Sequence, residues 1–243
     1  MPGFHPVRET LLRGQTRIDE LWIVKGKSSE RVREILRMAE ERGISIQFKK
    51  GLILDTLLPG IAHQGIVALA QKFTYVDLNH IIETSAYHPE PALIIAADHI
   101  TDEGNLGALM RTAVFFGAHG LILPKDRSAQ VTERVRKRSS GAYAHLPVAR
   151  VVNLSRALDI SSKKGFWIIG AAGESPESIY QFDWNRDLVL VLGSEDRGLR
   201  RSIRSHCHQL VSIPSSGQVD SLNISVAGGI ILSEIVRQRR MGK

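Results

Sequence analysis

The chain has 243 residues, of which 43% are hydrophobic, so it can bury one large core or two smaller ones and is not expected to be disordered. Its net charge of +7 favours a polyanionic partner such as nucleic acid, with a merely basic enzyme as the alternative. Cys207 is the only cysteine, which excludes intrachain disulfides and CxxC zinc sites, and no stretch has the roughly 20 apolar residues of a membrane span.

The first 74 residues alternate between helical and extended patterns. Apolar runs predict strands at 21–25 and 65–72, and the segment 28–43 predicts an amphipathic helix. The apolar residues at helical spacing in that segment are Val32, Ile35, Leu36 and Ala39. The amino-terminal residues lack the apolar core of a signal peptide and include acidic side chains, so we expect a cytoplasmic protein.

Prolines 89 and 91 interrupt the alternation and suggest a boundary between two domains. We therefore expect a first domain at 1–74, a linker at 75–91 and a second domain at 92–243.

From residue 92 onward, aliphatic runs alternate with helical stretches. Nearly continuous aliphatic and β-branched runs are typical of strands buried on both faces of a parallel sheet. Such runs are found at 92–98, 120–124, 165–172, 187–193 and 209–214. The second domain is therefore predicted to be an α/β domain with a mainly parallel sheet.

Polar residues follow three of these strands, each just before a predicted helix. At the first junction Asn105 is the expected N-cap of the helix. Arg111 could extend its guanidinium back toward the end of the sheet. The alternative is a solvated surface residue, which is the more common outcome for a lone arginine in a helix. At the second junction Gly193 ends a strand and Glu195 follows in a turn, where the helix dipole favours a carboxylate even without a function.

The third junction leads into a helix expected to begin near Leu222, with Asp220 or Ser221 as its N-cap. Gly228 and Gly229 lie inside this helix, where each costs about 1 kcal/mol relative to alanine, so we expect an unusually close packing partner there. Because ligands of open α/β sheets bind at the carboxyl ends of the strands, the three junctions are expected to form one site.

Three segments at these junctions carry a family resemblance. The sequences NLGALMR (105–111), LGSEDRGL (192–199) and IPSSGQVDSLNISVA (213–227) resemble the three ordered motifs of the SpoU/TrmH class of RNA 2′-O-ribose methyltransferases in the SPOUT superfamily. FHPVRETL (4–11) and HQGIVALAQ (63–71) resemble the ribosomal-protein-like substrate-binding domain of the bacterial 23S rRNA guanosine 2′-O-methyltransferases. One departure is PSSG, where family members often have a bulky residue after the proline.

The resemblance implies a fold, a cofactor and an assembly. It implies a carboxyl-terminal trefoil knot that holds S-adenosylmethionine, preceded by a small α/β RNA-binding domain, in a homodimer formed through the catalytic domain without a metal. Arg111 would then act on the ribose 2′-hydroxyl, Asn105 and Glu195 would position it and the RNA, and Ser221 with Asn223 would complete the site. The implied cofactor contacts are Leu192, Gly193, Gly198, Ile213, Leu222 and Ser225.

The substrate implied by the resemblance is RNA, with a guanosine of 23S rRNA as the first expectation and tRNA as the alternative. Looped RNA suits the reaction because a splayed nucleotide exposes its 2′-hydroxyl. The basic segment 127–141 is the expected phosphate-binding region, with an ordinary solvated helix as the alternative.

Two other functions compete with this reading. A non-enzymatic RNA-binding protein would share the charge without a cofactor site, and a serine acyl-hydrolase would use Ser221 or the run 161–164. The hydrolase is disfavoured because the chain has no G-x-S-x-G elbow.

Overall fold

The computed structural model describes residues 1–13, 18–70, 73–194, 197–217 and 221–241. Contacts divide the chain into two compact units, Met1–Phe73 (unit 1) and Thr74–Lys243 (unit 2). In the described part of the chain, no helix combines the length and the apolar character that crossing a membrane requires.

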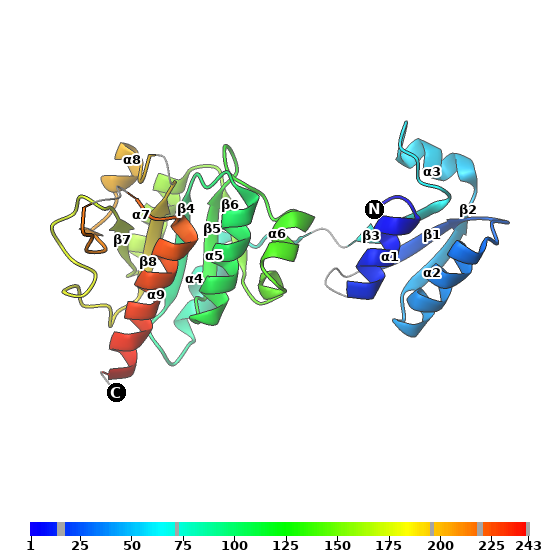
Figure 1. The fold of residues 1–243 in the computed structure, drawn as a ribbon. Coiled ribbons are helices and arrows are strands. Elements are labelled where there is room, and N and C mark those ends of the chain that lie inside the picture. Colours follow the sequence, from blue (N-terminus) through cyan, green and yellow to red (C-terminus); the bar gives the residue numbers. More distant parts are fainter. Residues whose placement is uncertain (14–17, 71–72, 195–196, 218–220, 242–243) are drawn as a thin grey trace. The chain divides into compact units, whose positions relative to one another are not determined.

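Unit 1 is a small α/β unit built on a three-stranded sheet in the order β2-β1-β3, in which β1 pairs parallel with β2 and antiparallel with β3. Its core joins α1 and α2 to β1 and β3, and Ser29 caps α2 by accepting a hydrogen bond from the Val32 amide. In chain order the elements are α1 (Phe4–Arg13), β1 (Ile18–Val24), α2 (Glu30–Glu41), β2 (Ser45–Lys49), α3 (Gly51–Leu57) and β3 (Ile66–Ala70) (Figure 1).

Unit 2 is built on a six-stranded sheet in the order β6-β5-β4-β8-β7-β9, and every neighbouring pair is parallel. Its strands are β4 (Leu93–Asp98), β5 (Gly120–Pro124), β6 (Val148–Val151), β7 (Trp167–Ala171), β8 (Leu188–Gly193) and β9 (Gln209–Val211). The five runs predicted as strands all form strands, and the central β4 is buried along its whole length. The α/β fold with a parallel sheet is therefore confirmed, whereas the edge strand β6 was not predicted.

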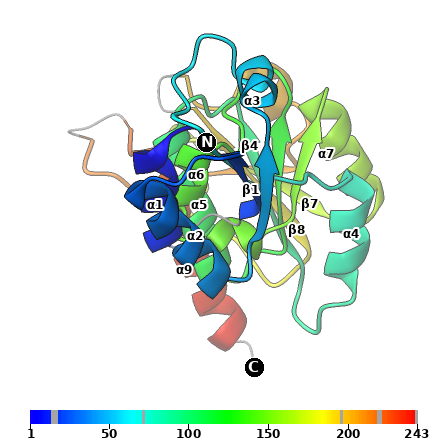
Figure 2. The ribbon, with the colours of Figure 1, turned by 90° about the vertical axis from the view of Figure 1, so that its right-hand side faces the viewer.

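Helices cover both faces of the unit 2 sheet. Figure 2 shows α4 and α7 on one face and α5 with α9 on the other, in agreement with the contacts of α4 with β5 and β6 and of α9 with α5 and β8. The helical segments are α4 (Leu78–Ala86), α5 (Glu103–Phe115), α6 (Glu133–Arg138), η1 (Ala142–Ala144), α7 (Leu154–Lys163), α8 (Arg201–Arg204) and α9 (Ile224–Met241).

The segment 75–91, expected to be a linker, instead belongs to unit 2. It contains α4, whose Ile81 and Ile82 are buried in the main core of that unit. Ile81 packs so closely that a Cβ on Gly120 would lie 2.3 Å from its Cγ2. The two prolines follow the helix and do not prevent it, so they mark a turn between α4 and β4 and not a boundary between domains.

Two helix starts also differ from the prediction. The N-cap of α5 is Asp102, whose carboxylate accepts a hydrogen bond from the Asn105 amide, so Asn105 lies in the first turn. Helix α9 begins at Ile224, and the residue before it, Asn223, accepts a hydrogen bond from the Ser225 amide. Of the predicted caps of α9, Ser221 lies ahead of the helix and Asp220 lies outside the described residues.

Candidate active site

A hydrogen bond between two asparagines joins the first and third junctions. The Asn223 side-chain amide nitrogen donates to Asn105 Oδ1 over 2.9 Å, although the residues are 118 positions apart in the sequence. Asn223 Oδ1 accepts from the amide and the hydroxyl of Ser225, at 2.9 and 2.6 Å. The start of α9 thus orients the Asn223 side chain toward the first turn of α5.

A tight backbone contact closes the second junction. The Gly198 amide donates to the Ser194 carbonyl over 2.8 Å, which holds Gly198 next to the end of β8. A Cβ on Gly193 would lie 2.1 Å from the Gly198 carbonyl carbon, and no flexible side chain there could move aside. Only glycine therefore fits at position 193.

Gly228 lets α9 pack closely against both α5 and β8, so the elements of all three junctions meet at this glycine. A Cβ at this position in α9 would lie 2.9 Å from Leu109 Cδ1 of α5 and 3.1 Å from Leu192 Cδ1 of β8. Leu192 is buried, so a ligand at the loop would meet its backbone and not its side chain. The expected close packing is found at Gly228 but not at Gly229, where a Cβ would make an ordinary contact of 3.5 Å with Thr112.

Arg111 is exposed on α5 and contacts the basic segment 127–141. Its Nη1 donates to Ser140 Oγ over 3.4 Å. Helix α6 in that segment packs against α5, and Arg136, Lys137 and Arg138 lie in its last turn. The last turn of α6 therefore adds positive charge in a segment that packs directly against α5, the helix of Arg111.

Three of the remaining predicted site residues follow β9. Ile213 is half-buried next to Ser212, whose backbone bonds to Glu177 and Ile179. Ser221 is exposed, and Leu222 leaves 46% of its surface exposed beside Asn223. Glu195 lies outside the described residues.

A buried carboxylate that the sequence reasoning missed ties the first and second junctions together. Asp98, the last residue of β4, has no exposed side-chain surface. Its two oxygens accept hydrogen bonds from the Arg200 amide (3.0 Å), Arg200 Nε (2.9 Å) and His99 Nδ1 (2.9 Å). An aspartate ending an otherwise aliphatic strand was a usable signal, because a buried charge needs partners.

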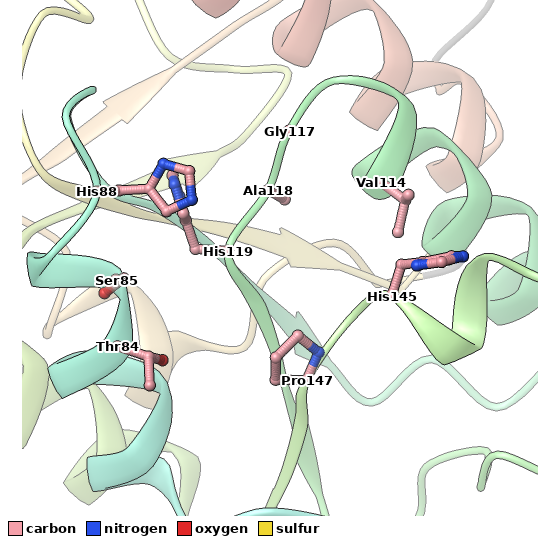
Figure 3. A pocket seen from close by; sticks show the side chains of 9 residues that line it. All are labelled: Thr84, Ser85, His88, Val114, Gly117, Ala118, His119, His145 and Pro147. Carbon is pink, nitrogen blue, oxygen red and sulfur yellow. The ribbon is translucent and has the colours of Figure 1, made fainter.

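The opposite end of the sheet has a separate pocket of about 390 Å³, shown in Figure 3. The rings of His88 and His119 lie 4.3 Å apart in it, and His119 Nδ1 accepts a hydrogen bond from the Leu93 amide at 3.0 Å. Burial lowers the pKa of His119, and the nearby His88 lowers this pKa further. None of the residues in the three motifs lines this pocket.

The fold and the three joined loops define a class of enzyme. The model of the SpoU rRNA methylase family matches residues 92–233, and a model for the substrate-binding domain of RNA 2′-O-ribose methyltransferases matches residues 2–76. The chain belongs to the SpoU rRNA methylase family, which confirms the resemblance of the motifs.

Individual relatives are similar over nearly the whole chain. The 23S rRNA (guanosine-2′-O-)-methyltransferase RlmB of Haemophilus influenzae is 42% identical over 238 residues, covering 98% of this chain and 96% of that protein. RlmB of Escherichia coli is 40% identical over 237 residues, covering 98% and 97%. The crystal structure of the SpoU methyltransferase AviRb from Streptomyces viridochromogenes in complex with AdoMet is 27% identical, with a TM-score of 0.69 over 100% of this chain and 90% of that one.

Proposed function

We propose that this chain methylates the ribose 2′-hydroxyl of a guanosine in 23S rRNA, with S-adenosylmethionine as the methyl donor. The general activity, RNA 2′-O-methylation, follows from the family. The observation that carries the choice of 23S rRNA is the similarity to RlmB over 98% of the chain, because it includes unit 1 as well as the catalytic unit.

The loops of the site suit the cofactor in two ways. Gly193 and Gly198 approach each other closely at the end of β8, and their peptide groups can meet a ligand there. The exposed surface of Leu222 offers an apolar contact beside the asparagine pair. We assign the cofactor to these residues together with Leu192, Ile213 and Ser225.

When bound, S-adenosylmethionine supplies a methyl group on a sulfonium, which is already activated for transfer. The protein therefore has to orient the ribose and stabilise charge on its 2′-oxygen. In our proposal Asn105 and Asn223, with Ser221 and Glu195, position the nucleotide. Arg111 stabilises the developing negative charge, and a group other than Arg111 accepts the proton, because a guanidinium does not deprotonate in proteins.

The basic segment 127–141 is proposed to hold the RNA phosphates near Arg111. Its support is the contact between Arg111 and Ser140 and the three cations in the last turn of α6. The trefoil knot and a homodimer formed through unit 2 remain proposals that we take from the family resemblance, and a cytoplasmic location remains a proposal made from the sequence.

The direct test is transfer of a labelled methyl group from S-adenosylmethionine to a 23S rRNA transcript, with bulk tRNA as the competing substrate. Primer extension then maps the 2′-O-methyl mark. A mark on a 23S rRNA guanosine is the expected result, and a mark on tRNA alone would contradict the rRNA assignment. If calorimetry detects no binding of S-adenosylmethionine while RNA binding persists, the chain is an RNA-binding protein without this activity.

Substitutions at Arg111 test its role. Arg111→Gln is expected to lower kcat by about 10²–10³, the usual cost of removing a group that stabilises charge in the transition state. Near-full turnover of Arg111→Lys, with a pH profile that follows the lysine, would instead identify a base at this position.

A further inference from the structure

A groove lies at the edge of the unit 2 sheet, outside the three motifs. Two adjoining pockets of about 670 Å³ and about 510 Å³ form it, and they share Asp77, His80 and Arg150. The groove lies between the start of α4, the start of α7 and the carboxyl ends of β5 and β6. We call it the β6-edge groove.

The cations of the groove are available for a ligand. Lys125, Arg150 and Arg156 line it, and in the described part of the chain none of the three forms an ion pair. Arg150 is held in place, because its guanidinium lies 5.1 Å from the centre of the Tyr75 ring and its Nη2 donates to the Lys125 carbonyl over 3.0 Å. Lys125 and Arg156 are exposed.

The acidic residues of the groove are Asp77 and Glu83, both on the α4 side. The amino-terminal ends of α4 and α7 also open into the groove, since Asn79 and Asn153 line it. Their dipoles add positive potential to that of the three cations. The groove as a whole therefore favours a ligand with negative charge.

Apolar and aromatic surface accompanies this charge. Tyr75 is half-buried, Val152 leaves 73% of its surface exposed, and Leu78 and Ile160 are half-buried. Cations combined with an aromatic ring and exposed apolar surface are the features that bind single-stranded RNA, because each nucleotide presents a phosphate and a flat base.

The groove also lies at the end of the sheet where the three motifs meet. β6 is two strands from β4, and neighbouring strands are about 4.8 Å apart, so the two strand ends are separated by about 10 Å. We propose that the β6-edge groove binds the single-stranded RNA next to the methylated nucleotide. This inference rests on the proposed function, because it assumes an RNA substrate at the motif loops.

The test reverses two exposed charges in the groove and compares them with two outside it. The groove variant is Lys125→Glu with Arg156→Glu, and the control is Lys163→Glu with Lys164→Glu, exposed residues at the other end of α7. Both change the charge of the protein equally. The probe is the 23S rRNA transcript, and its affinity is measured across a series of KCl concentrations.

The groove variant should bind the transcript at least tenfold more weakly than the control. The slope of log K against log [KCl] should become shallower by about 0.7 for each phosphate that the groove variant no longer binds. Both variants should keep the wild-type unfolding midpoint and affinity for S-adenosylmethionine.

Equal RNA affinity and equal salt slopes in the groove variant and the control would overturn the proposal for the groove. The proposed function would still stand in that case if the wild type methylates the transcript. If the wild type neither methylates nor binds the transcript, the proposed function itself fails.

Discussion

At the scale of single residues, the Asp98 carboxylate connects two loops of the site. It is fully buried, and it binds both the backbone and the side chain of Arg200, 102 positions further along the chain. Since hydrogen bonds to a charged group are worth more than neutral ones, this contact holds the loop after β8 against the end of β4. Asp98 is thus a positioning residue in our reading of the site.

We expect Asp98→Asn to lower the free energy of unfolding by about 1.5–3 kcal/mol, because the neutral amide keeps the shape and loses the charge. Urea titration measures this change. The control is Glu174→Gln, which removes the ion pair between Glu174 and Arg204. The Glu174 side chain is 60% exposed, so this substitution should cost no more than about 1 kcal/mol. Equal losses in the two variants would contradict the role of Asp98.

His119 should make the stability of the protein depend on pH. Burial and the neighbouring His88 lower the pKa of His119 in the folded protein, while the unfolded chain binds the proton with an ordinary pKa near 6.5. The contribution of His119 to stability is therefore complete above about pH 6.5, and it is lost as the pH falls from there toward the lowered folded-state pKa.

Urea unfolding between pH 8 and pH 5.5 tests this expectation. The wild type should lose more free energy of unfolding over this range than His119→Gln, whose side-chain oxygen can still accept from the Leu93 amide. His145→Gln is the matched control, because it removes an exposed histidine from the same pocket. Parallel pH profiles for the wild type and His119→Gln would refute the prediction.

At the scale of helices and strands, the sequence predicted which elements form better than where they begin. Long aliphatic runs revealed the buried strands, but β6 has four residues including Arg150 and gives no comparable signal. At the start of α5, Asp102 and Asn105 are both common capping residues, and only the backbone geometry decides between them. The asparagine pair could not be found from either helix alone, because the hydrogen bond joins residues 118 positions apart.

The two glycines of α9 allow a matched comparison. Alanine at either position gains the same helix propensity, about 1 kcal/mol, so the difference between the variants reports packing alone. At Gly228 the new methyl group would press on Leu109 and Leu192, whereas at Gly229 it has room. We expect Gly228→Ala to be less stable than Gly229→Ala by about 1–3 kcal/mol, measured by thermal or urea unfolding. The close-packing interpretation fails if the two variants are equally stable.

At the scale of the whole molecule, the division into units depends on contacts that the sequence does not display. The two prolines at 89 and 91 made residues 75–91 look like a linker in the sequence. The isoleucines of α4, which precede the prolines, are nevertheless part of the core of unit 2. The 3.6-residue pattern of a nine-residue helix is short, and the helix packs against β5 and β6, which follow it only at residues 120–124 and 148–151. A local pattern could therefore not assign α4 to a domain.

Two truncated chains test where unit 2 begins. Residues 74–243 keep α4, and we expect this fragment to fold and to bind S-adenosylmethionine like the full chain. It should bind 23S rRNA more weakly, because it lacks nearly all of the region at residues 2–76 that matches the substrate-binding domain. Residues 92–243 lack Ile81 and Ile82, whose removal exposes the core that they cover, and the loss of one such side chain costs about 2–5 kcal/mol. That fragment should unfold at much lower urea concentration or aggregate. If it is as stable as residues 74–243 and binds the cofactor equally well, α4 is dispensable and unit 2 begins at β4.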